Sequence, residues 1–600
     1  MLDHASAAAS WLSNLVSDTA GKPPTLPQLF QLGDRLAAAT PPPDAATQRI
    51  AVVGGVTIDY LRRAIACAVA AEGVFPVTYQ ATFGSYVQDI LDPASALHAF
   101  APDLIVIAPS HRDLIAPLPI AATAAETDAA LEPAVALFRK LWASLAARKI
   151  RIIQHLLVPP VARYRGPADR LAPAAPANQV RRLNDALLAA GRGLVHFLDM
   201  EQLATAIGSR RWSAERFHYA AKLDFDPRWL PDYLAPFRAA WRAANARAKK
   251  LLALDLDNTL WGGVIGDDGV EGIALGPASA AGEAFADWQR MLKGLAERGV
   301  VLAVCSKNAP EIAATGFTHP NSVLRREDFA AFECSWNDKA GGLRRIARAL
   351  NLGLDSFVFA DDNPVECALV RQELPEVAVV ELGADPAQFV ELFDAGCWFD
   401  LPAYTSDDLG RAAAYTARAA ALAEQESATD IDAYLASLAM TGRLYRPEEA
   451  DIARVAQLEL KTNQFNLTTR RYAEAAIRDF MAREDALVLA FRLADRFGDH
   501  GLVSTLIAFH EGDALRIDSW LMSCRVFARS AEQYILRGVI AEALARGAAR
   551  LVGEYQPTAK NDVVAGLYSK LGFTPSDDTF FVREVDAGTD DLVTHIGAVF

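Results

Sequence analysis

Two aspartates two residues apart follow an apolar run in the middle of the chain. In LLALDLDNTLW (251–261) the apolar residues predict a buried strand, with Asp255 and Asp257 at its carboxyl end. Ligands of an open parallel sheet bind beyond the carboxyl ends of its strands. Two carboxylates there can share a hard cation such as Mg2+ and still leave one oxygen free to attack. The spacing therefore predicts a metal-dependent phosphoryl-transfer site.

Three further motifs follow in the order that such a site needs. GVVLAVCSKN predicts a strand ending at Ser306, whose hydroxyl is suited to hold a phosphoryl oxygen. WNDKAGGLRRIA places Lys339 at the start of a helix, where a fixed cation can neutralise a phosphate. SFVFADDNPVE predicts another strand, which ends in the metal-binding pair Asp361 and Asp362. Phosphoryl transfer requires this combination of metal, cation and positioned nucleophile.

The motifs define two sets of expected ligands. The carboxylates expected to bind Mg2+ are those of Asp255, Asp257, Asp361 and Asp362. The neighbouring residues expected to bind the substrate are Thr259, Trp261, Gly262, Lys307 and Asn308. The alternative is that all of these are ordinary polar residues at strand ends and helix caps. Four motifs in the required order favour a site.

The four motifs together resemble the phosphatases of the haloacid-dehalogenase superfamily. The resemblance implies a Rossmann-like core in which Asp255 is the nucleophile that forms an aspartyl-phosphate. Asp257 would then be the general acid and base, and Ser306 and Lys339 would complete the catalytic set.

The motifs are too closely spaced for an inserted cap domain. The stretches from Ser306 to Lys339 and from Lys339 to Asp361 are short, and the stretch from Asp257 to Ser306 holds only a flap and one helix. Without a lid of its own, the site is covered by neighbouring domains or serves a bulky substrate. Both alternatives favour a substrate presented on another macromolecule over a free sugar phosphate.

A narrower resemblance begins at DLDNTLWGGVIGDDG. This string, with VCSKN and FADDNPVE, looks like the FkbH-like family of polyketide biosynthesis. The resemblance continues in ARVAQLELKTNQFNLTTRRY, DRFGDHGLVS and WLMSCRVFAR, and it covers most of residues 246–600. It implies a glyceryltransferase/phosphatase that takes the three-carbon unit of 1,3-bisphosphoglycerate. Such enzymes remove phosphate and load glycerate as a thioester on the phosphopantetheine arm of an acyl carrier protein.

The implied chemistry draws attention to Cys305. An acyl phosphate is an activated acyl donor, and a thiolate is a good nucleophile for it. Cys305 directly precedes Ser306 and is a candidate to carry a glyceryl thioester, with Cys524 as the second choice. The alternative is a small buried core residue, because neighbours along a strand point to opposite faces.

Composition narrows the class of protein. With 59 Lys and Arg against 74 Asp and Glu, the net charge of −15 argues against nucleic acid as the main partner. Six scattered cysteines favour a reduced, cytoplasmic setting over a disulfide framework or a zinc site. No apolar run approaches the roughly 20 residues that span a bilayer, and no signal peptide is expected.

The strand and helix patterns predict a multidomain α/β protein. Apolar strands alternating with Ala-rich helices indicate two parallel-sheet domains, and consecutive strands near the C-terminus indicate a smaller α+β domain. The expected parts are a helical segment (1–45), an SGNH-like α/β domain (46–245), a haloacid-dehalogenase-like domain (246–405), a helical connector (406–435) and a GNAT-like domain (436–600).

The flanking domains resemble enzymes but lack parts of the expected sites. The C-terminal domain resembles GNAT acetyltransferases, with Tyr568 where many of them keep a general acid. Its pyrophosphate-loop region lacks closely spaced glycines, which argues against acetyl-CoA binding. The N-terminal domain resembles SGNH hydrolases, with Thr57 where the serine is expected and His218 in ERFH. A lid, docking or scaffold role is favoured over catalysis there.

Polar residues of the C-terminal domain are candidates for docking the carrier protein. They are Lys461, Asn463, Asn466, Arg470 and Arg525, and their alternative is a solvated helix face with a capped turn. Three functions remain for the whole chain. The first is glyceryl transfer to the carrier, the second is phosphatase activity on another metabolite without a carrier, and the third is a carrier-docking acyltransferase with a vestigial phosphatase site.

Overall fold

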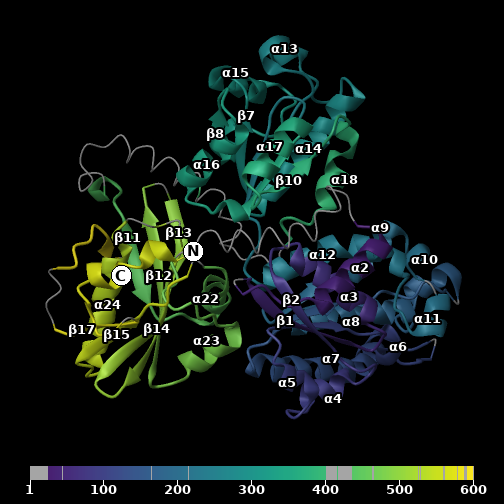
Figure 1. Cartoon of the computed structure of the whole chain (residues 1–600), viewed down its shortest axis with the longest axis horizontal. Coiled ribbons are helices and arrows are strands. Elements are labelled where there is room, and N and C mark those ends of the chain that lie inside the picture. The colour runs from purple at the N-terminus through teal and green to yellow at the C-terminus, as the bar shows by residue number, and fades with distance from the viewer. Residues whose placement is uncertain are drawn as a thin grey trace. The chain divides into compact units, whose positions relative to one another are not determined.

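The computed structural model describes residues 24–400, 415 and 435–598, except for 44, 120, 164, 214, 463–464, 497, 524–525, 527–528, 559–560, 578 and 587–590. The chain divides into two compact units, the first ending at Asn245 and the second beginning at Ala246. The second unit contains two separate sheets (Figure 1). Nearly all of the predicted connector and the first half of the predicted N-terminal segment lie outside the described residues.

The first unit is a five-stranded parallel sheet in the order β2-β1-β3-β4-β5. Its strands are β1 (Thr47–Gly54), β2 (Phe75–Gln80), β3 (Leu104–Ala108), β4 (Arg151–His155) and β5 (Val195–Leu198). Alternate residues of β1 pack on opposite faces, and each face is covered by helices. One face carries α2 (Leu26–Ala38), α3 (Asp59–Ala70) and α12 (Leu230–Ala244), and the other carries α7 (Ala124–Ala147) and α8 (Pro176–Ala190).

The shorter helices of this unit lie in its loops. They are α4 (Tyr86–Leu91), α5 (Ala96–Phe100), α6 (His111–Leu114), α9 (Met200–Ile207), α10 (Ser209–Trp212) and α11 (Glu215–Ala221).

Residues 246–399 form a second parallel sheet, in the order β10-β9-β6-β7-β8. The strands are β6 (Leu251–Leu254), β7 (Val301–Ser306), β8 (Phe329–Cys334), β9 (Phe357–Asp361) and β10 (Ala378–Glu381). Leu252 and Leu254 pack under α14 (Ala280–Glu297) and α18 (Phe389–Asp394). Leu251 and Ala253 pack under α16 (Lys339–Leu350) and α17 (Pro364–Glu373). Because all five strands are parallel, their carboxyl ends share one edge.

Short polar caps fix where the helices at that edge begin. The Asp338 carboxylate accepts the Gly341 N–H at the start of α16, and the Asn363 side chain accepts the Val365 N–H at the start of α17. Two shorter helices also lie at this edge, α13 (Ile265–Gly272) and α15 (Pro310–Thr315). The caps place the first residues of α16 and α17 directly after β8 and β9.

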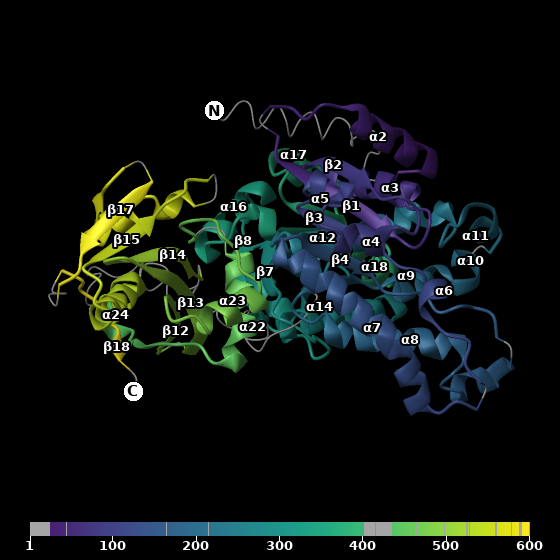
Figure 2. The same cartoon turned by 90° about the horizontal axis from the view of Figure 1, so that it is seen from below.

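The C-terminal residues form a largely antiparallel sheet in the order β16-β17-β15-β14-β13-β12-β11-β18. Figure 2 shows it between α24 on one side and α22 and α23 on the other, as the two apolar clusters require. The helices are α22 (Glu449–Lys461), α23 (Glu474–Met481), α24 (Ala531–Ala545) and α25 (Leu567–Lys570). The strands are β11 (Thr441–Tyr445), β12 (Ala486–Asp495), β13 (Gly498–Glu511), β14 (Ala514–Met522), β15 (Arg550–Glu554), β16 (Thr574–Pro575), β17 (Phe580–Glu584) and β18 (Gly597–Ala598).

The predicted fold class is confirmed. Two parallel α/β sheets precede an α+β domain in which, among the described strands, only β14 with β15 and β11 with β18 pair in parallel. Within the described part of the chain, no helix combines the length and apolar character needed to cross a membrane.

A buried carboxyl group makes the C-terminal domain sensitive to pH. Glu459 of α22 is fully buried and accepts hydrogen bonds from the hydroxyls of Thr505 (3.0 Å) and Ser519 (3.0 Å). Burial raises the pKa of Glu459 to about 8, against an ordinary value of 4.5, although the two hydroxyl donors oppose the shift. The folded domain therefore holds a proton that the unfolded chain loses above about pH 4.5.

Glu459→Gln is expected to remove this dependence. In the wild type, folding stability falls as pH rises from about 4.5 to about 8, because only the folded state keeps the proton. The amide keeps the shape without titrating, so the variant should match the wild type at pH 5 and exceed it at pH 8.5 by an amount on the order of a few kcal/mol. Thermal unfolding at both pH values measures this. The exposed Glu484→Gln is the control, and equal pH slopes for Glu459→Gln and wild type would contradict the assignment.

Candidate active site

Neighbouring strands bring the predicted residues to one edge of the central sheet. Asp255 follows β6, Ser306 ends β7, and Asp361 ends β9, and β6 lies between the other two strands. The Asp255 N–H donates to the Ala360 carbonyl at 3.1 Å, which aligns the ends of β6 and β9. The motifs that are far apart in the sequence thus form one site.

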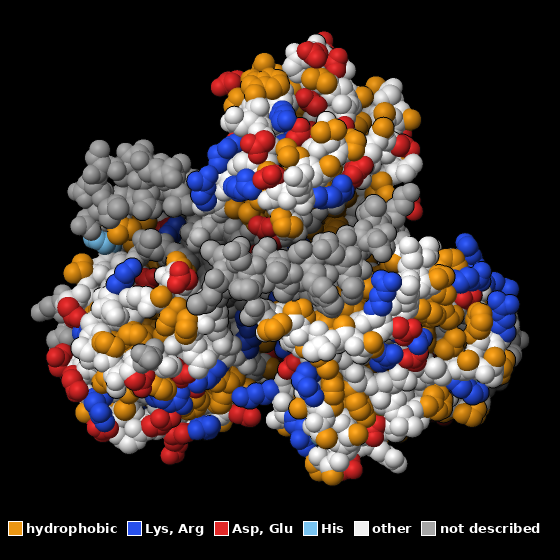
Figure 3. Space-filling model, in the orientation of Figure 1, with side chains coloured by type: hydrophobic (Ala, Val, Ile, Leu, Met, Phe, Trp, Pro, Cys, Tyr) orange, Lys and Arg blue, Asp and Glu red, His pale blue; other side chains and the backbone are white. Residues whose placement is uncertain are grey.

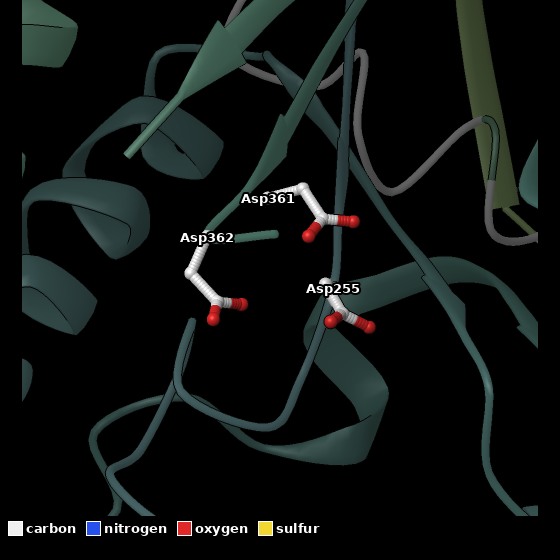
Figure 4. A group of neighbouring side chains, drawn as sticks. All are labelled: Asp255, Asp361 and Asp362. Carbon is white, nitrogen blue, oxygen red and sulfur yellow. The ribbon is translucent and has the colours of Figure 1, made fainter. Parts of the chain in front are cut away.

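Three of the predicted carboxylates converge. One oxygen from each of Asp255, Asp361 and Asp362 lies within 4.8 Å of the others (Figure 4). Thr259 donates its hydroxyl to Asp362 at 3.1 Å, and the Asn363 N–H donates to Asp361 at 2.8 Å. The buried Oδ1 of Asp255 has no hydrogen-bond partner, although buried polar atoms normally have one. An all-oxygen set with an unsatisfied buried oxygen fits Mg2+.

Lys339 is the fixed cation of the site. Its side chain is only 4% exposed, its Nζ lies 3.0 Å from Asp255 Oδ2, and it also pairs with Asp361. Burial alone would lower the pKa of Lys339, but the carboxylates of Asp255 and Asp361 outweigh burial and raise it. The amine therefore stays protonated.

The carboxylates repel one another in spite of this lysine. Burial and the nearby Asp255 raise the pKa of Asp361 to about 6, and Lys339 only partly offsets them. The same two causes raise the pKa of Asp362. A divalent cation between these groups would relieve the repulsion, which is a second reason that the residues fit Mg2+.

Asp257 departs from the prediction that its side chain binds the metal. The group of converging carboxylates does not include it. Its Oδ1 accepts the Trp261 indole N–H at 3.0 Å and the Ile265 N–H at 2.9 Å, and its Oδ2 accepts the Asn308 amide at 2.8 Å. The turn after β6 sends this side chain toward the flap, where the donors hold it in one orientation.

Several predicted substrate ligands have structural partners instead. Trp261 is fully buried, with its indole bound to Asp257. A Cβ on Gly262 would stand 2.9 Å from the Phe285 ring, so this glycine allows close packing of the flap. Lys307 pairs with Glu366 at 2.5 Å. Trp261 and Gly262 thus shape the flap that holds Asp257, and their role as substrate ligands stays a prediction.

Ser306 and Asn308 are hydrogen-bonded to each other. Both are buried at the end of β7, and the Asn308 amide donates to Ser306 Oγ at 3.3 Å as well as to Asp257. Asn308 therefore links the predicted acid/base to the predicted phosphate-binding hydroxyl.

Cys305 lies on the other face of β7. Its thiol is buried against α16 and donates to the Lys339 carbonyl at 3.5 Å. Burial raises the pKa of Cys305, which disfavours a thiolate, although Lys339 acts in the opposite direction. This geometry favours the core-residue alternative. The side chain of Cys524 lies outside the described residues.

Two of the C-terminal candidates for carrier docking, Asn466 and Arg470, are engaged within their own domain. Asn466 is buried and accepts the Thr469 N–H at 2.8 Å, so it is corrected to a structural residue. Arg470 bridges the Asp518 carbonyl at 3.0 Å and the buried Glu554 carboxylate at 2.8 Å, between β14 and β15. Asn463, Arg525 and the side chain of Lys461 lie outside the described part of the chain.

The N-terminal domain shows no free hydroxyl at the position that the resemblance suggested. Thr57 Oγ1 donates to the Ala221 carbonyl at 2.6 Å, and its N–H donates to the Lys222 carbonyl at 3.0 Å. Burial lowers the pKa of His218, as do Arg112 and Lys222. Thr57 here joins a loop to the end of α11.

Two residues of the site were missed from the sequence. Asn363 positions Asp361 through its N–H and caps α17 through its side chain, and Glu366 holds Lys307. The Asn-Pro pair was a readable signal, because Asn before a proline at the first helical position is a common helix start. Nothing in the sequence pairs Glu366 with Lys307.

Comparison with known proteins adds one informative likeness. No family model matches the sequence, and no curated protein does. A solved structure, the N-terminal part of the protein BF1531 from Bacteroides fragilis, containing a phosphatase domain complexed with Mg, is 26% identical. The match has a TM-score of 0.56 and covers 64% of this chain and 100% of that chain. The likeness confirms that part of this chain has the fold of that phosphatase-containing structure.

The C-terminal domain matches acetyltransferases more weakly. The ribosomal-protein-S18-alanine N-acetyltransferase from Escherichia coli is 17% identical, with a TM-score of 0.20 over 25% of this chain and 96% of that one. The GNAT domain of Streptomyces lividans PAT is 13% identical, with a TM-score of 0.20 over 24% of this chain and 90% of that one. These likenesses carry no argument about activity.

Mg2+ affinity is expected to depend on pH. The raised pKa of Asp361, about 6, means that this ligand is protonated below pH 6 and must release its proton when the cation binds. The apparent Kd should therefore be flat above about pH 7 and rise roughly tenfold per pH unit below 6. Calorimetric Mg2+ titrations from pH 5 to pH 8 measure this. A Kd independent of pH across that range would contradict the arrangement.

Proposed function

We propose that this chain is a Mg2+-dependent enzyme that removes phosphate through Asp255. The observation that carries the proposal is the convergence of three carboxylates and the buried Lys339 at the carboxyl edge of a parallel sheet. The likeness, over 64% of the chain, to a structure that contains a phosphatase domain complexed with Mg supports the same cofactor. When bound, Mg2+ would polarise the phosphoryl oxygens and neutralise their charge.

The residues fit a two-step displacement. A free oxygen of Asp255 attacks phosphorus, and the bond from phosphorus to the leaving oxygen breaks. Asp257, held by Trp261 and Asn308, protonates that oxygen and then takes a proton from the water that hydrolyses the aspartyl-phosphate. Ser306 and Lys339 hold the transferred group, and inorganic phosphate leaves.

The finer proposal is glyceryl transfer to a carrier protein, which rests on the FkbH-like motifs. The thiol of the carrier's phosphopantetheine arm attacks the acyl-phosphate carbon of 1,3-bisphosphoglycerate, and the bond to the phosphate oxygen breaks. The three-carbon unit still carries a phosphate ester. The phosphoryl group of this ester is then transferred to Asp255, and the aspartyl-phosphate is hydrolysed. The buried, protonated state of Cys305 supports direct acylation of the carrier thiol over an intermediate on this residue.

A carrier-independent phosphatase is the second candidate. It is favoured by the internal hydrogen bonds of Asn466 and Arg470, which occupy two of the groups assigned to carrier docking. Phosphate release that needs no carrier would support this candidate. A vestigial site is disfavoured, because a buried lysine and three carboxylates without a function would destabilise the domain.

Asp255→Asn is expected to abolish phosphate release from a generic monoester such as p-nitrophenyl phosphate. The amide cannot form the covalent intermediate, so kcat should fall by at least about a thousandfold. Phosphate release with and without Mg2+ measures this. The matched control is Asp267→Asn, an exposed aspartate of the same domain, which should keep wild-type activity. Full activity of Asp255→Asn would overturn the assignment of the nucleophile.

Glyceryl transfer is tested on the carrier itself. Purified protein with Mg2+, 1,3-bisphosphoglycerate and a pantetheinylated acyl carrier protein should raise the carrier's intact mass by one glyceryl unit. Asp255→Asn should instead leave a phosphoglyceryl unit on the carrier, because the acylation step does not use this aspartate. An unchanged carrier mass with the wild type would reject the carrier while leaving the phosphatase proposal in place.

A further inference from the structure

Large apolar side chains are exposed at the edge of the sheet that carries the site. Among the described residues 246–399, the exposed large hydrophobic residues are Val264, Ile312, Trp336, Val365, Val390 and Leu392. The first four follow β6, β7, β8 and β9, the four strands whose ends position the site. Figure 3 shows hydrophobic side chains among acidic ones over α13 and α15 at this edge. Exposed apolar groups that cluster at a site usually mark a binding surface.

Trp336 is the largest and most exposed of these residues. Its side chain is 76% exposed, although tryptophan is normally well buried. The residue before it is fixed, because the Ser335 N–H donates to the Ser306 carbonyl at 3.1 Å. Two residues after it, Asp338 caps α16, which begins with Lys339. Trp336 therefore lies on a short loop that is fixed on both sides, by the bond of Ser335 to Ser306 and by the cap of the helix that begins with Lys339.

Val365 lies on the opposite flank. It is 72% exposed and is the second residue of α17, three residues after Asp362. The strand order β9-β6-β7-β8 puts the loops that carry Val365 and Trp336 on either side of β6 and β7. The ends of those strands, which carry Asp255 and Ser306, thus lie between the loops of these two exposed residues.

The rest of a substrate must lie outside the buried group of residues that would hold its phosphate. Asp255, Ser306 and Lys339 are buried, so the group attached to the phosphate must leave the pocket through the edge that Trp336 and Val365 flank. The sequence between these motifs is too short for an inserted cap that would otherwise contact that group. An indole beside the opening gains free energy when an apolar part of the substrate covers it.

We propose that Trp336 determines which phosphorylated substrates the site accepts, by packing on the apolar part of the group that bears the phosphate. This inference rests on the proposed phosphatase function and adds the substrate class: monoesters whose organic part carries an apolar segment that reaches the indole, such as an extended arm. Val365 provides the facing wall.

Straight-chain alkyl phosphates test this packing without changing the chemistry. Ethyl, butyl and hexyl phosphate have similar leaving groups and differ in apolar length. With Mg2+, the wild-type kcat/KM should rise by about fourfold per methylene that covers the indole, roughly fifteenfold from ethyl to butyl phosphate. Trp336→Ala should remove that rise through KM, with kcat and the ethyl phosphate reaction unchanged within about twofold. Trp336→Phe should keep part of it.

The controls separate the two proposals. Leu392→Ala, at an exposed leucine of α18, should keep the wild-type dependence on chain length. If kcat/KM depended on chain length in Trp336→Ala as it does in the wild type, or did not depend on it in the wild type, the role of Trp336 would be overturned. The phosphatase proposal would remain in place. No phosphate release from any ester by the wild type would instead reject the phosphatase proposal.

A binding measurement tests Trp336 without turnover. In a Trp11→Phe background, Trp336 should dominate quenching of fluorescence by acrylamide, because every other tryptophan of the described residues is buried or half-buried. In Asp255→Asn with Mg2+, hexyl phosphate should lower the quenching constant, and ethyl phosphate should not. Trp336→Phe in the same background should show no such difference. Quenching that hexyl phosphate leaves unchanged would overturn the inference.

Discussion

The central domain is organised around a buried charge imbalance. Asp255, Asp361 and Asp362 bring three carboxylates within 4.8 Å of one another, and Lys339 supplies one compensating charge. Burying like charges is costly unless partners neutralise them. The parallel strands, the cap of α16 and the hydrogen bonds from Thr259 and Asn363 all hold the carboxylates in place against that repulsion. The domain thus retains unfavourable repulsion between these carboxylates, which a bound divalent cation would relieve.

The predicted site was most accurate where backbone geometry alone determines position. Asp255, Ser306 and Asp361 come directly at the ends of adjacent parallel strands, so the apolar runs before them were enough to bring them together. Lys339 followed from the helix start after Asp338. Asp257 lies three residues beyond the end of its strand, and its direction depends on a turn and on partners from distant segments. Local sequence carries no information on such partners.

The C-terminal domain illustrates the same limit on a larger scale. Its fold class was predicted from consecutive strands, but residues of KTNQFNLTTRRY were assigned to a surface. The Asn466 carbonyl instead accepts the Asn561 amide, and the Leu467 carbonyl accepts the Gln556 N–H. Together with the contacts of Arg470 to both strands, these hydrogen bonds hold the KTNQFNLTTRRY loop against β14 and β15. Polar residues that satisfy buried backbone groups and polar residues that bind partners have the same composition, so sequence cannot separate them.

The position of Cys305 has a consequence for how the domain can be studied. Its thiol touches the carbonyl of Lys339 and lies beneath α16, on the face of β7 away from the Ser306 hydroxyl. An alkylating reagent can reach this sulfur only when the first turn of α16 lifts from the sheet. The same movement withdraws the ammonium group from its two aspartates. The rate at which Cys305 is alkylated therefore measures how often the ion pairs of Lys339 with Asp255 and Asp361 break.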